Sequence, residues 1–398
     1  MTPDFLIVGG GVIGISIARE LKKRYADSSV AVMEKEQSCA LHASGRNSGV
    51  LHAGFYYTAD SLKARFTRDG NRELTQYCAE RRIQINKCGK LVVAQTEGDH
   101  ALMDELLVRG RWNGVELHAI DAQEAREIEP RVKTQGMAIF SPTTSSVDPL
   151  NVVRSLEQDA KREGVEIRYG VSYLGRHGKE IITTAGEISP GYFVNAAGLY
   201  ADQVARGFGF SENYRILPFK GLYLYSDESA GAIRTNIYPV PDLRNPFLGV
   251  HFTVTADGRS KIGPTAIPAL WREQYRAHEN FRLGEFLDIV RRQFGLFAHS
   301  NFGFKKLALE EIRKYSRARM VSLAAALAAG VNKENYRKWG RPGMRAQLVN
   351  VRERRLEMDF VIEGDNRSMH VLNAVSPGFT CCLPFARYVC DAVSENLD

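Results

Sequence analysis

The stretch from Ser44 to Arg65, SGRNSGVLHAGFYYTADSLKAR, combines a Gly- and Ser-rich first half with a second half that carries His52, Tyr57 and Lys63. Gly-rich backbone follows a ligand surface closely because it adds little bulk. A histidine titrates near neutral pH and is suited to accept a proton during catalysis. A stretch of this kind is typical of a loop that holds a ligand.

A glycine motif at the N-terminus predicts what kind of cofactor this is. DFLIV (4–8) predicts a buried parallel strand, GGGVIG follows, and ISIARELKKRY continues with helical periodicity. In this strand–G-x-G-x-x-G–helix pattern, Gly9 allows the tight turn, Gly11 lets the backbone approach a pyrophosphate, and Gly14 lets helix and strand pack closely. The amides of the helix N-terminus then face the phosphates. A glycine-rich turn without a ligand is the alternative.

The second predicted strand, VAVMEK, places an acid at the expected distance from the motif. Glu34 lies 20 residues after Gly14, and Lys35 follows it. A carboxylate at this place accepts hydrogen bonds from a ribose hydroxyl and repels a 2′-phosphate. We predict that Glu34 and Lys35 contact an adenosine ribose that lacks that phosphate.

Two later segments favour FAD over NAD. YFVNAAGLYAD (192–202) reads as a strand, a small-residue turn and a helix start, with Gly198 and Asp202 as candidate cofactor contacts. Near the C-terminus, a strand (369–374) leads through a Pro-Gly loop to a helix predicted from about Phe379. The positive end of that helix would stabilise the negative charge of a reduced flavin. The cofactor contacts predicted here are Pro377, Gly378, Phe379 and Thr380.

Together these stretches resemble the FAD-dependent oxidoreductases of the D-amino-acid oxidase superfamily, and within it the L-2-hydroxyglutarate dehydrogenase/oxidase family. The resemblance covers nearly the whole chain. It is carried by VGGGVIG, GRNSGVLHAGFYYTADSLKA, CGKLVVA, IFSPTTSSVDP, YPVPDLRNPFLGVHFT, IGPTAI, GMRAQ and NAVSPGFT. It implies FAD-dependent oxidation of L-2-hydroxyglutarate to 2-oxoglutarate by hydride transfer to the flavin, with a quinone or oxygen taking the electrons.

The resemblance also implies a fold of α/β plus α+β class. A Rossmann-type FAD-binding domain is expected from residues 1–85, 148–216 and 341–398, and an antiparallel-sheet substrate domain with helices from 86–147 and 217–340. The residues agree, because PFKGLYLY, FLGVHFTVT and SKIGPTAI are short β-rich runs bounded by Gly, Pro and Asp. Residues 281–331 are mostly helical in pattern.

In such a fold the opening loop would run beside the flavin. Its first half would contact the cofactor, and its second half, from His52 to Lys63, would form the floor of the substrate pocket. The cofactor contacts expected there are Ser44, Arg46, Asn47, Ser48, Gly49 and Val50. His52 is the candidate base for the substrate hydroxyl; its alternatives are a packed histidine or one that holds the flavin ring. His251, in GVHFT, is the rival, as base or as a donor that orients the carbonyl.

A buried carboxylate substrate must be paired with cationic or phenolic donors. Arg345 in GMRAQ is the best candidate, since a guanidinium grips a carboxylate with two hydrogen bonds; it is also a candidate cofactor contact. The second-rank candidates are Tyr57, Lys63, Lys220, Tyr223 and Thr265. No metal site is expected.

Composition limits the number of domains, the compartment and the class of protein. The 398 residues suit two or three globular domains, and the six cysteines lack metal spacing, so reduced thiols in a cytoplasmic compartment are expected. Neither a signal peptide nor a membrane-spanning segment is expected from the N-terminus or from the longest apolar run, 320–331. No nucleic-acid-binding module is recognisable.

The net charge of +7 is uneven. Residues 281–345 hold 14 Lys or Arg against five Asp or Glu. Such a basic face would suit peripheral docking to an anionic inner membrane, with a quinone as acceptor; a solvated helical face is the alternative.

Three functions stay open at this stage. The first is the flavin dehydrogenase acting on a 2-hydroxy acid. The second is an amino-acid or amine oxidase of the same superfamily. The third is a flavin-binding protein without turnover.

Overall fold

A six-stranded sheet forms one half of the computed structural model, which describes residues 2–242, 247–299 and 304–397. Its order is β23-β24-β13-β1-β2-β9, and all neighbouring pairs are parallel except β23 with β24. The strands are β1 (Phe5–Val8), β2 (Val30–Glu34), β9 (Glu166–Tyr169), β13 (Tyr192–Asn195), β23 (Val361–Gly364) and β24 (Ser368–Asn373). Sequence segments far apart therefore meet in one sheet, and the strands predicted at 4–8, 30–34 and 192–195 are confirmed.

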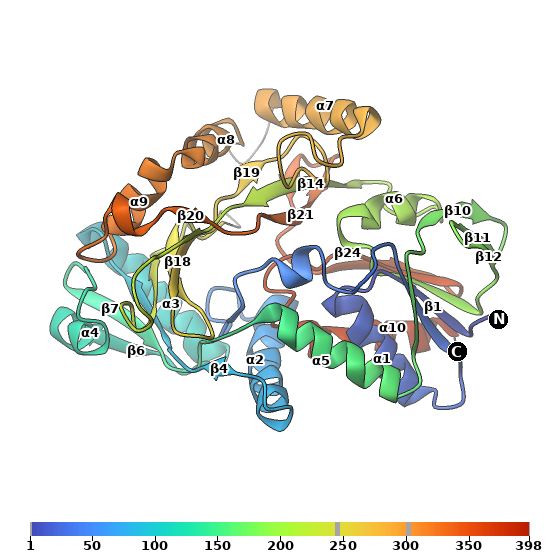
Figure 1. Cartoon of the computed structure of the whole chain (residues 1–398), viewed down its shortest axis with the longest axis horizontal. Helices are drawn as coiled ribbons and strands as arrows, with labels where there is room; N and C mark the ends of the chain where they lie inside the picture. The colour runs from blue at the N-terminus through green and yellow to red at the C-terminus, as the bar shows by residue number, and fades with distance from the viewer. Residues whose placement is uncertain (1, 243–246, 300–303, 398) are drawn as a thin grey trace.

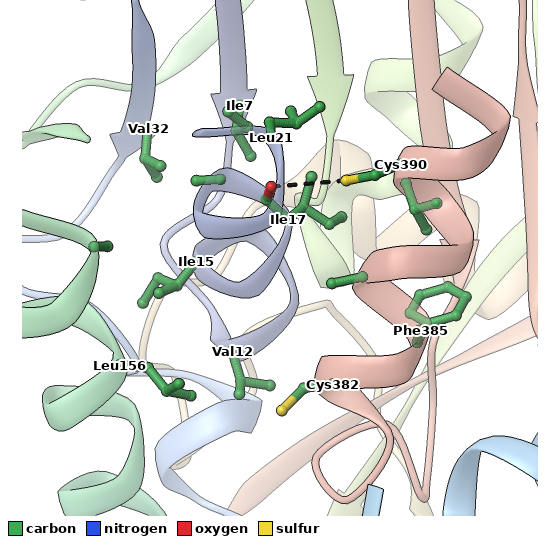
Figure 2. Packing of buried hydrophobic residues seen from close by; sticks show 14 of the residues in the cluster. Ile7, Val12, Ile15, Ile17, Leu21, Val32, Leu156, Cys382, Phe385 and Cys390 are labelled. Atoms are coloured by element: carbon green, nitrogen blue, oxygen red, sulfur yellow. Dashed lines mark hydrogen bonds between the residues drawn. The ribbon is translucent and has the colours of Figure 1, made fainter. Parts of the chain in front are cut away.

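Helix α1 (Val12–Arg24) packs against this sheet and is flanked by α5 (Pro149–Arg162) and α10 (Cys382–Leu397). Figure 2 shows part of the apolar core that results, in which Ile15 of α1 points toward Leu156 of α5 and Ile17 lies on the side of α10. Central strands β1 and β2 are buried along their whole length, as expected of parallel strands covered on both faces. The second face is covered by α6 (Ala201–Arg206) and by the small antiparallel sheet of β10 (Tyr173–His177), β11 (Glu180–Thr183) and β12 (Gly186–Ile188).

An eight-stranded sheet forms the second half, in the order β20-β15-β18-β17-β16-β5-β7-β6. Its strands are β5 (Lys90–Val93), β6 (His118–Asp121), β7 (Met137–Ser141), β15 (Leu224–Tyr225), β16 (Asn236–Pro239), β17 (His251–Val254), β18 (Ser260–Gly263) and β20 (Lys338–Trp339). The sheet is antiparallel except for the pair β5 and β16. These two strands come from segments far apart in the chain, so no short hairpin forces them to run in opposite directions.

Two smaller sheets connect the halves. One is the antiparallel sheet of β14 (Tyr214–Gly221), β19 (Ile267–Pro268), β21 (Gly343–Asn350) and β22 (Arg355–Leu356); the other joins β3 (Val50–Leu51), β4 (Ile85–Asn86) and β8 (Ser145–Val147). Strand β14 runs through the domain boundary predicted at 216. The predicted domain ranges stay a prediction, and they include residues 1, 243–246, 300–303 and 398, which lie outside the described residues.

The remaining helices cover the outside of the molecule. They are α2 (Leu62–Glu80), α3 (His100–Trp112), α4 (Ala122–Ile128), α7 (Leu283–His299), α8 (Phe304–Ile312) and α9 (Arg317–Ala325), with short 3-10 turns at Ala43–Gly45, Glu97–Asp99, Gly198–Tyr200, Arg313–Tyr315 and Lys333–Asn335. In Figure 1, β1, α1 and α10 lie at the end with both termini, β6, β7 and α4 lie at the opposite end, and α7 and α8 lie along one edge. The helical pattern expected after residue 281 is thus confirmed. Within the described ranges, no helix has the length and apolarity needed to cross a bilayer.

Candidate active site

A cavity of about 900 Å³ is lined by both halves of the molecule. Its walls come from the β1–α1 turn, the loop after β2, strands β14, β17 and β21, and the turn before α10. This volume lies at the upper end of the range of about 300–1,000 Å³ typical of small-molecule sites. One end of the cavity is therefore a nucleotide-type turn, and the other reaches the eight-stranded sheet.

The β1–α1 turn forms the first end. Gly9 has φ +111°, and a Cβ on Gly14 would meet Gly9 O at 2.0 Å, so both positions need glycine for the turn and for the strand–helix contact. Gly9, Gly11 and Glu34 line the cavity, whereas Gly14 does not. Ser44 Oγ accepts a hydrogen bond from Val12 N at 2.9 Å. The predicted loop therefore lies directly against the N-terminus of α1.

The carboxylate of Glu34 is held in place by hydrogen bonds from the backbone. It accepts hydrogen bonds from Gly10 N at 2.8 Å and from Glu36 N at 2.9 Å, and it is buried at the cavity wall. Each carboxylate oxygen retains a further lone pair that a ribose hydroxyl could use. The arrangement fits the ribose contact predicted for Glu34.

Lys35 also lines the cavity, but its ammonium group is engaged. Its Nζ lies 3.0 Å from Glu36 Oε1 and also contacts a carboxylate oxygen of Glu273, while His42 Nε2 lies 2.9 Å from the same Glu36 oxygen. Glu36, His42 and Glu273 are close enough to one another to resemble a metal-binding group. Because the ammonium group of Lys35 already contacts both carboxylates, we assign no metal to this cluster.

Arg46 and Asn47 shape the loop from within. Arg46 donates from Nε to Leu41 O at 2.6 Å, and its guanidinium lies 4.1 Å from the ring centroid of Tyr275. Asn47 Nδ2 donates to Ser44 O, and its Oδ1 accepts from Gly49 N. Both side chains therefore hold the loop conformation, while Arg46, Asn47, Ser48 and Val50 still line the cavity.

The turn before α10 meets this loop. Pro377, Gly378, Phe379 and Thr380 all line the cavity, and Gly378 approaches the chain so closely that a Cβ would lie 1.9 Å from Ala374 O. Thr380 Oγ1 donates to Val50 O and accepts from His52 N at 3.2 Å. The helix begins at Cys382 rather than near Phe379, because residues 377–381 first form a separate turn. Through Thr380, this turn fixes the position of His52 relative to Val50 on the cavity wall.

His52 and His251 lie at the second end of the cavity. Burial lowers the pKa of His52 well below its usual range, and the nearby charges of Lys90, His251 and Arg345 lower it further. Burial, together with Lys90, lowers the pKa of His251 to about 3. His251 Nδ1 lies 3.0 Å from Gly249 O, and its ring stacks on Tyr238 at 3.6 Å. Both imidazoles are therefore neutral near pH 7.

Unpaired basic groups surround these histidines. Arg345 forms no ion pair among the described residues, its Nε is buried without a hydrogen-bond partner there, and burial lowers the pKa of the guanidinium to about 10. Lys63 is buried as well, and burial with the nearby Arg345 lowers its pKa to about 8. Its Nζ lies 5.9 Å from the ring centroid of Tyr57. The charge of Asp359 partly offsets the lowering at Lys63, whereas no acidic group acts on Arg345 in this way among the described residues. A buried cation without a paired anion is costly, so an anionic ligand would stabilise this end.

Three more predicted residues line the cavity at other points. Gly198 lies on the cavity wall with open space where a Cβ would stand. Tyr223 contributes a buried phenol, and burial raises the pKa of that phenol. Thr265 donates from its hydroxyl to Lys220 O and accepts from Leu222 N, so it fixes the bend after β14.

Four predicted site residues do not line the cavity: Gly14, Gly49, Asp202 and Lys220. A Cβ on Gly49 would meet Val147 O at 2.2 Å, so this residue faces β8. Asp202 forms a buried ion pair with Arg272 at 2.8 Å. Lys220 lies between the cavity residues Phe219 and Gly221 on β14, and alternate residues of a strand point to opposite faces.

Sequence reasoning missed Lys90, Tyr56 and Tyr238. The hydroxyl groups of both tyrosines are buried without a partner among the described residues, and both tyrosines line the cavity. Lys90 Nζ lies 3.5 Å from His52 Nδ1. The signal available in the sequence was a lysine inside the apolar run CGKLVVA, where a strand residue has little access to water.

The fold and the site together define a flavoenzyme, and comparison with known proteins agrees. The family model described as FAD dependent oxidoreductase (DAO) matches residues 4–392. The chain belongs to this family of FAD-dependent oxidoreductases.

Several similar proteins bear the name L-2-hydroxyglutarate dehydrogenase. The chain is 36% identical to a mitochondrial L-2-hydroxyglutarate dehydrogenase of Nematostella vectensis, covering 99% of this chain and 91% of that protein. It is 33% identical to L-2-hydroxyglutarate dehydrogenase of Escherichia coli K12 (99% and 94% covered) and 34% identical to the human mitochondrial protein of that name (99% and 89% covered).

Solved structures show the same fold at lower identity. An FAD-bound L-alpha-glycerophosphate oxidase of Mycoplasma pneumoniae superposes with a TM-score of 0.79 at 21% identity, covering 99% of this chain and 95% of that one. A glycine oxidase of Geobacillus kaustophilus gives 0.74 at 19% identity, with the same coverage. The α/β FAD-binding fold with a second, sheet-rich half expected from the sequence is thus confirmed.

Proposed function

We propose that this chain oxidises the hydroxyl group of L-2-hydroxyglutarate to give 2-oxoglutarate, with FAD as its cofactor. The observation that supports this most directly is the second end of the cavity, where two neutral histidines lie near Arg345, which has no acidic partner among the described residues. A dicarboxylate supplies the missing anions, and a neutral imidazole is ready to accept a proton. Relatives at 33–36% identity bear the corresponding name.

The residues of the first end fit FAD. Gly9 and Gly11 of the turn line the cavity at the N-terminus of α1, Glu34 lies on the same wall, and the 377–380 turn lines the wall toward His52. When bound, the flavin accepts the hydride that leaves the substrate Cα. We assign the dinucleotide to the wall formed by Gly9, Gly11, Glu34, Lys35, Ser44, Arg46, Asn47, Ser48, Val50, Gly198, Pro377, Gly378, Phe379 and Thr380.

The basic residues would hold and orient the substrate. Arg345 would bind one carboxylate through paired hydrogen bonds, and Lys63 with Tyr57 would receive the other. The anion raises the depressed pKa values of nearby bases, because it favours their protonated forms. His52 would then accept the hydroxyl proton, and His251 would donate to or orient the forming carbonyl oxygen.

The electron acceptor is a quinone or oxygen, and one surface favours a membrane quinone. The outer faces of α7 and α8 and the turn before α7 expose Phe281, Leu283, Leu287, Phe294, Leu309 and Ile312, with Phe294 73% and Leu283 61% exposed. Exposed basic residues adjoin them, among them Arg282, Arg291, Lys306 and Arg313. Because α7 and α8 lie along one edge of the molecule (Figure 1), these apolar and basic residues suit peripheral docking to an anionic membrane.

Docking of this edge is tested with vesicles. Phe294→Ser with Leu287→Ser should release the protein from vesicles that contain anionic lipid, while binding to neutral vesicles is weak for both proteins. Equal sedimentation of variant and wild type with anionic vesicles would refute the contact.

A cytoplasmic-side location agrees with six free thiols, five of them buried.

The main experiment is anaerobic addition of L-2-hydroxyglutarate to the purified FAD-loaded protein. Loss of the oxidised-flavin absorbance, with 2-oxoglutarate as product, is the expected outcome, and D-2-hydroxyglutarate is the matched control. Bleaching by glycine or another amino acid, and not by the hydroxy acid, would favour the amino-acid or amine oxidase function that the glycine oxidase fold also allows. Absence of bleaching with all of them would indicate a flavin-binding protein without turnover.

A further inference from the structure

Lys90 is a fully buried lysine with no role among the residues assigned above to cofactor or substrate. It lies on β5 near the middle of the eight-stranded sheet, with no exposed surface. Within the described ranges it forms no ion pair, and its Nζ has one side-chain hydrogen bond, to His52 Nδ1 at 3.5 Å. Burying an unpaired lysine is destabilising, so its position calls for a functional reason.

Aromatic rings surround the ammonium position. Nζ lies 4.5 Å from the ring centroid of Tyr238, 5.0 Å from that of Tyr56 and 5.3 Å from that of Phe55. Ring faces stabilise a cation without a carboxylate. Burial lowers the pKa of Lys90 to about 7. The site therefore tolerates both the neutral amine and the ammonium form near neutral pH.

The contact also orients His52. His52 lines the cavity, whereas Lys90 does not, so the Nδ1 edge of the imidazole faces Lys90 and the Nε2 edge is left for the cavity. When Lys90 is a neutral amine, Nδ1–H donates to Nζ, and Nε2 carries the lone pair that a base requires. A contact of this length is expected to shorten once a substrate is bound.

We propose that Lys90 positions His52 and receives its proton during substrate oxidation, an inference that rests on the proposed function. The substrate hydroxyl proton moves to His52 Nε2, and the Nδ1 proton moves to the Lys90 amine, which becomes ammonium. The O–H bond breaks as the C=O bond forms, and the Cα hydrogen leaves separately, as hydride with its electron pair, to the FAD cofactor. Lys90 touches no substrate atom, so it is a positioning residue.

The other charged groups near this pair act in the same direction. His251 and Arg345 lower the pKa of His52 together with Lys90, and Lys63 lies beside Arg345. The groups next to Lys90 itself are the phenols of Tyr56 and Tyr238 and the thiol of Cys88. Since all nearby cations oppose charging of the imidazole, removal of Lys90 should raise the pKa of His52.

Lys261 offers a matched control. It is also buried, it lies over the rings of Tyr223 and Tyr225 at 4.7 and 5.6 Å, and burial lowers its pKa to about 8. Among the hydrogen bonds of the described residues, none joins it to His52. Lys90→Met and Lys261→Met both replace a buried amine with an uncharged chain of similar length.

The first test is the thermal stability of the FAD-loaded proteins against pH. A lysine whose folded pKa is lower than its unfolded value destabilises the fold most at low pH, and this penalty fades as pH rises from about 7 toward 10.5. Lys90→Met should therefore gain Tm over the wild type near pH 7 and lose that gain near pH 10. Lys90→Met and His52→Gln should be non-additive in Tm, whereas Lys261→Met and His52→Gln should add.

The second test is the rate of anaerobic flavin reduction. Lys90→Met should slow reduction at pH 7 by ~10-fold or more and move the acid limb of kcat/KM upward, toward the usual histidine value of ~6.5. Lys90→Arg keeps the charge but cannot take a proton, so it should be slow without that upward move. Lys261→Met should keep the wild-type limb.

The outcomes separate the two proposals. If L-2-hydroxyglutarate does not reduce the wild type, the proposed function fails, whereas the Tm coupling still tests the His52–Lys90 pair. If the wild type is reduced but Lys90→Met shows wild-type rate and pH limb, or adds to His52→Gln in Tm, the role of Lys90 is overturned. An equal shift in Lys261→Met would also overturn it, because the effect would then come from net charge alone.

Discussion

The two ends of the cavity differ in whether backbone or side chains form most of the wall. At the nucleotide end the wall is largely backbone, and the charged side chains there already have partners: Lys35 with Glu36 and Glu273, and Arg46 with Leu41 O and the ring of Tyr275. At the histidine end the wall is side chains, and Arg345 has no acidic partner among the described residues. One end is thus specified by shape and the other by charge.

Under the proposed function, this difference separates the site of cofactor binding from the site of substrate binding. A turn made of backbone amides accepts the phosphates of a dinucleotide without any change of protonation. A cluster of buried bases with lowered pKa values responds strongly to an anion, because each base gains affinity for its proton when the anion arrives. Substitutions at the first end should therefore affect cofactor content, and substitutions at the second end should affect rate and substrate affinity.

The largest effect is expected at Gly11. A Cβ there would lie 3.1 Å from Ser44 Oγ, and the branched side chain of Gly11→Val would fill the space where the amides of the α1 N-terminus face the cavity. The variant should purify without FAD and without activity while retaining its far-UV circular dichroism. Cofactor content is measured by absorbance after release.

Gly175→Val is the matched control for that variant. Gly175 lies on β10, and a Cβ there meets nothing within 4 Å. It should keep full FAD content. If Gly11→Val retained FAD as well, the turn would not be the phosphate site, and the division between the two ends would be lost.

The first end was the more predictable from sequence because its geometry is local. The strand, the glycine spacing and Glu34 lie within one short stretch, and the same stretch forms the β1–α1–β2 unit. Asp202 could not be assigned in this way. Its partner Arg272 lies 70 residues away, and sequence periodicity does not reveal which distant cation neutralises a buried acid.

The second end depends on strand register, which the sequence leaves open. Lys220 was a reasonable substrate-binding candidate, but its neighbours Phe219 and Gly221 face the cavity instead. The sequence does not distinguish Lys90 from the other lysines. Its burial follows from the position of β5 between β7 and β16 in the sheet. His52, Tyr57, Lys63 and Arg345 line the cavity as predicted, while their roles stay predictions.

The next largest effect is expected at His52. His52→Ala should keep FAD bound but slow flavin reduction by at least ~10²-fold, the usual contribution of a general base. Stopped-flow reduction by L-2-hydroxyglutarate under anaerobic conditions measures this rate. His251→Ala is the parallel variant: a larger loss there, with little change in His52→Ala, would transfer the role of base to His251.

The smallest of the three effects is expected at Arg345, and it sharpens the contrast most. Arg345→Ala removes one charge-assisted partner of the substrate, which corresponds to ~10–10² in KM, while kcat changes less because the proton acceptor remains. FAD content should stay nearly complete if the residue serves the substrate more than the cofactor. Arg341→Ala, an exposed arginine shortly before β21, is the control and should leave KM unchanged. An unaltered KM in Arg345→Ala would remove this arginine from the substrate site, whereas loss of FAD would assign it to the cofactor end and show that charge, too, helps to hold the dinucleotide.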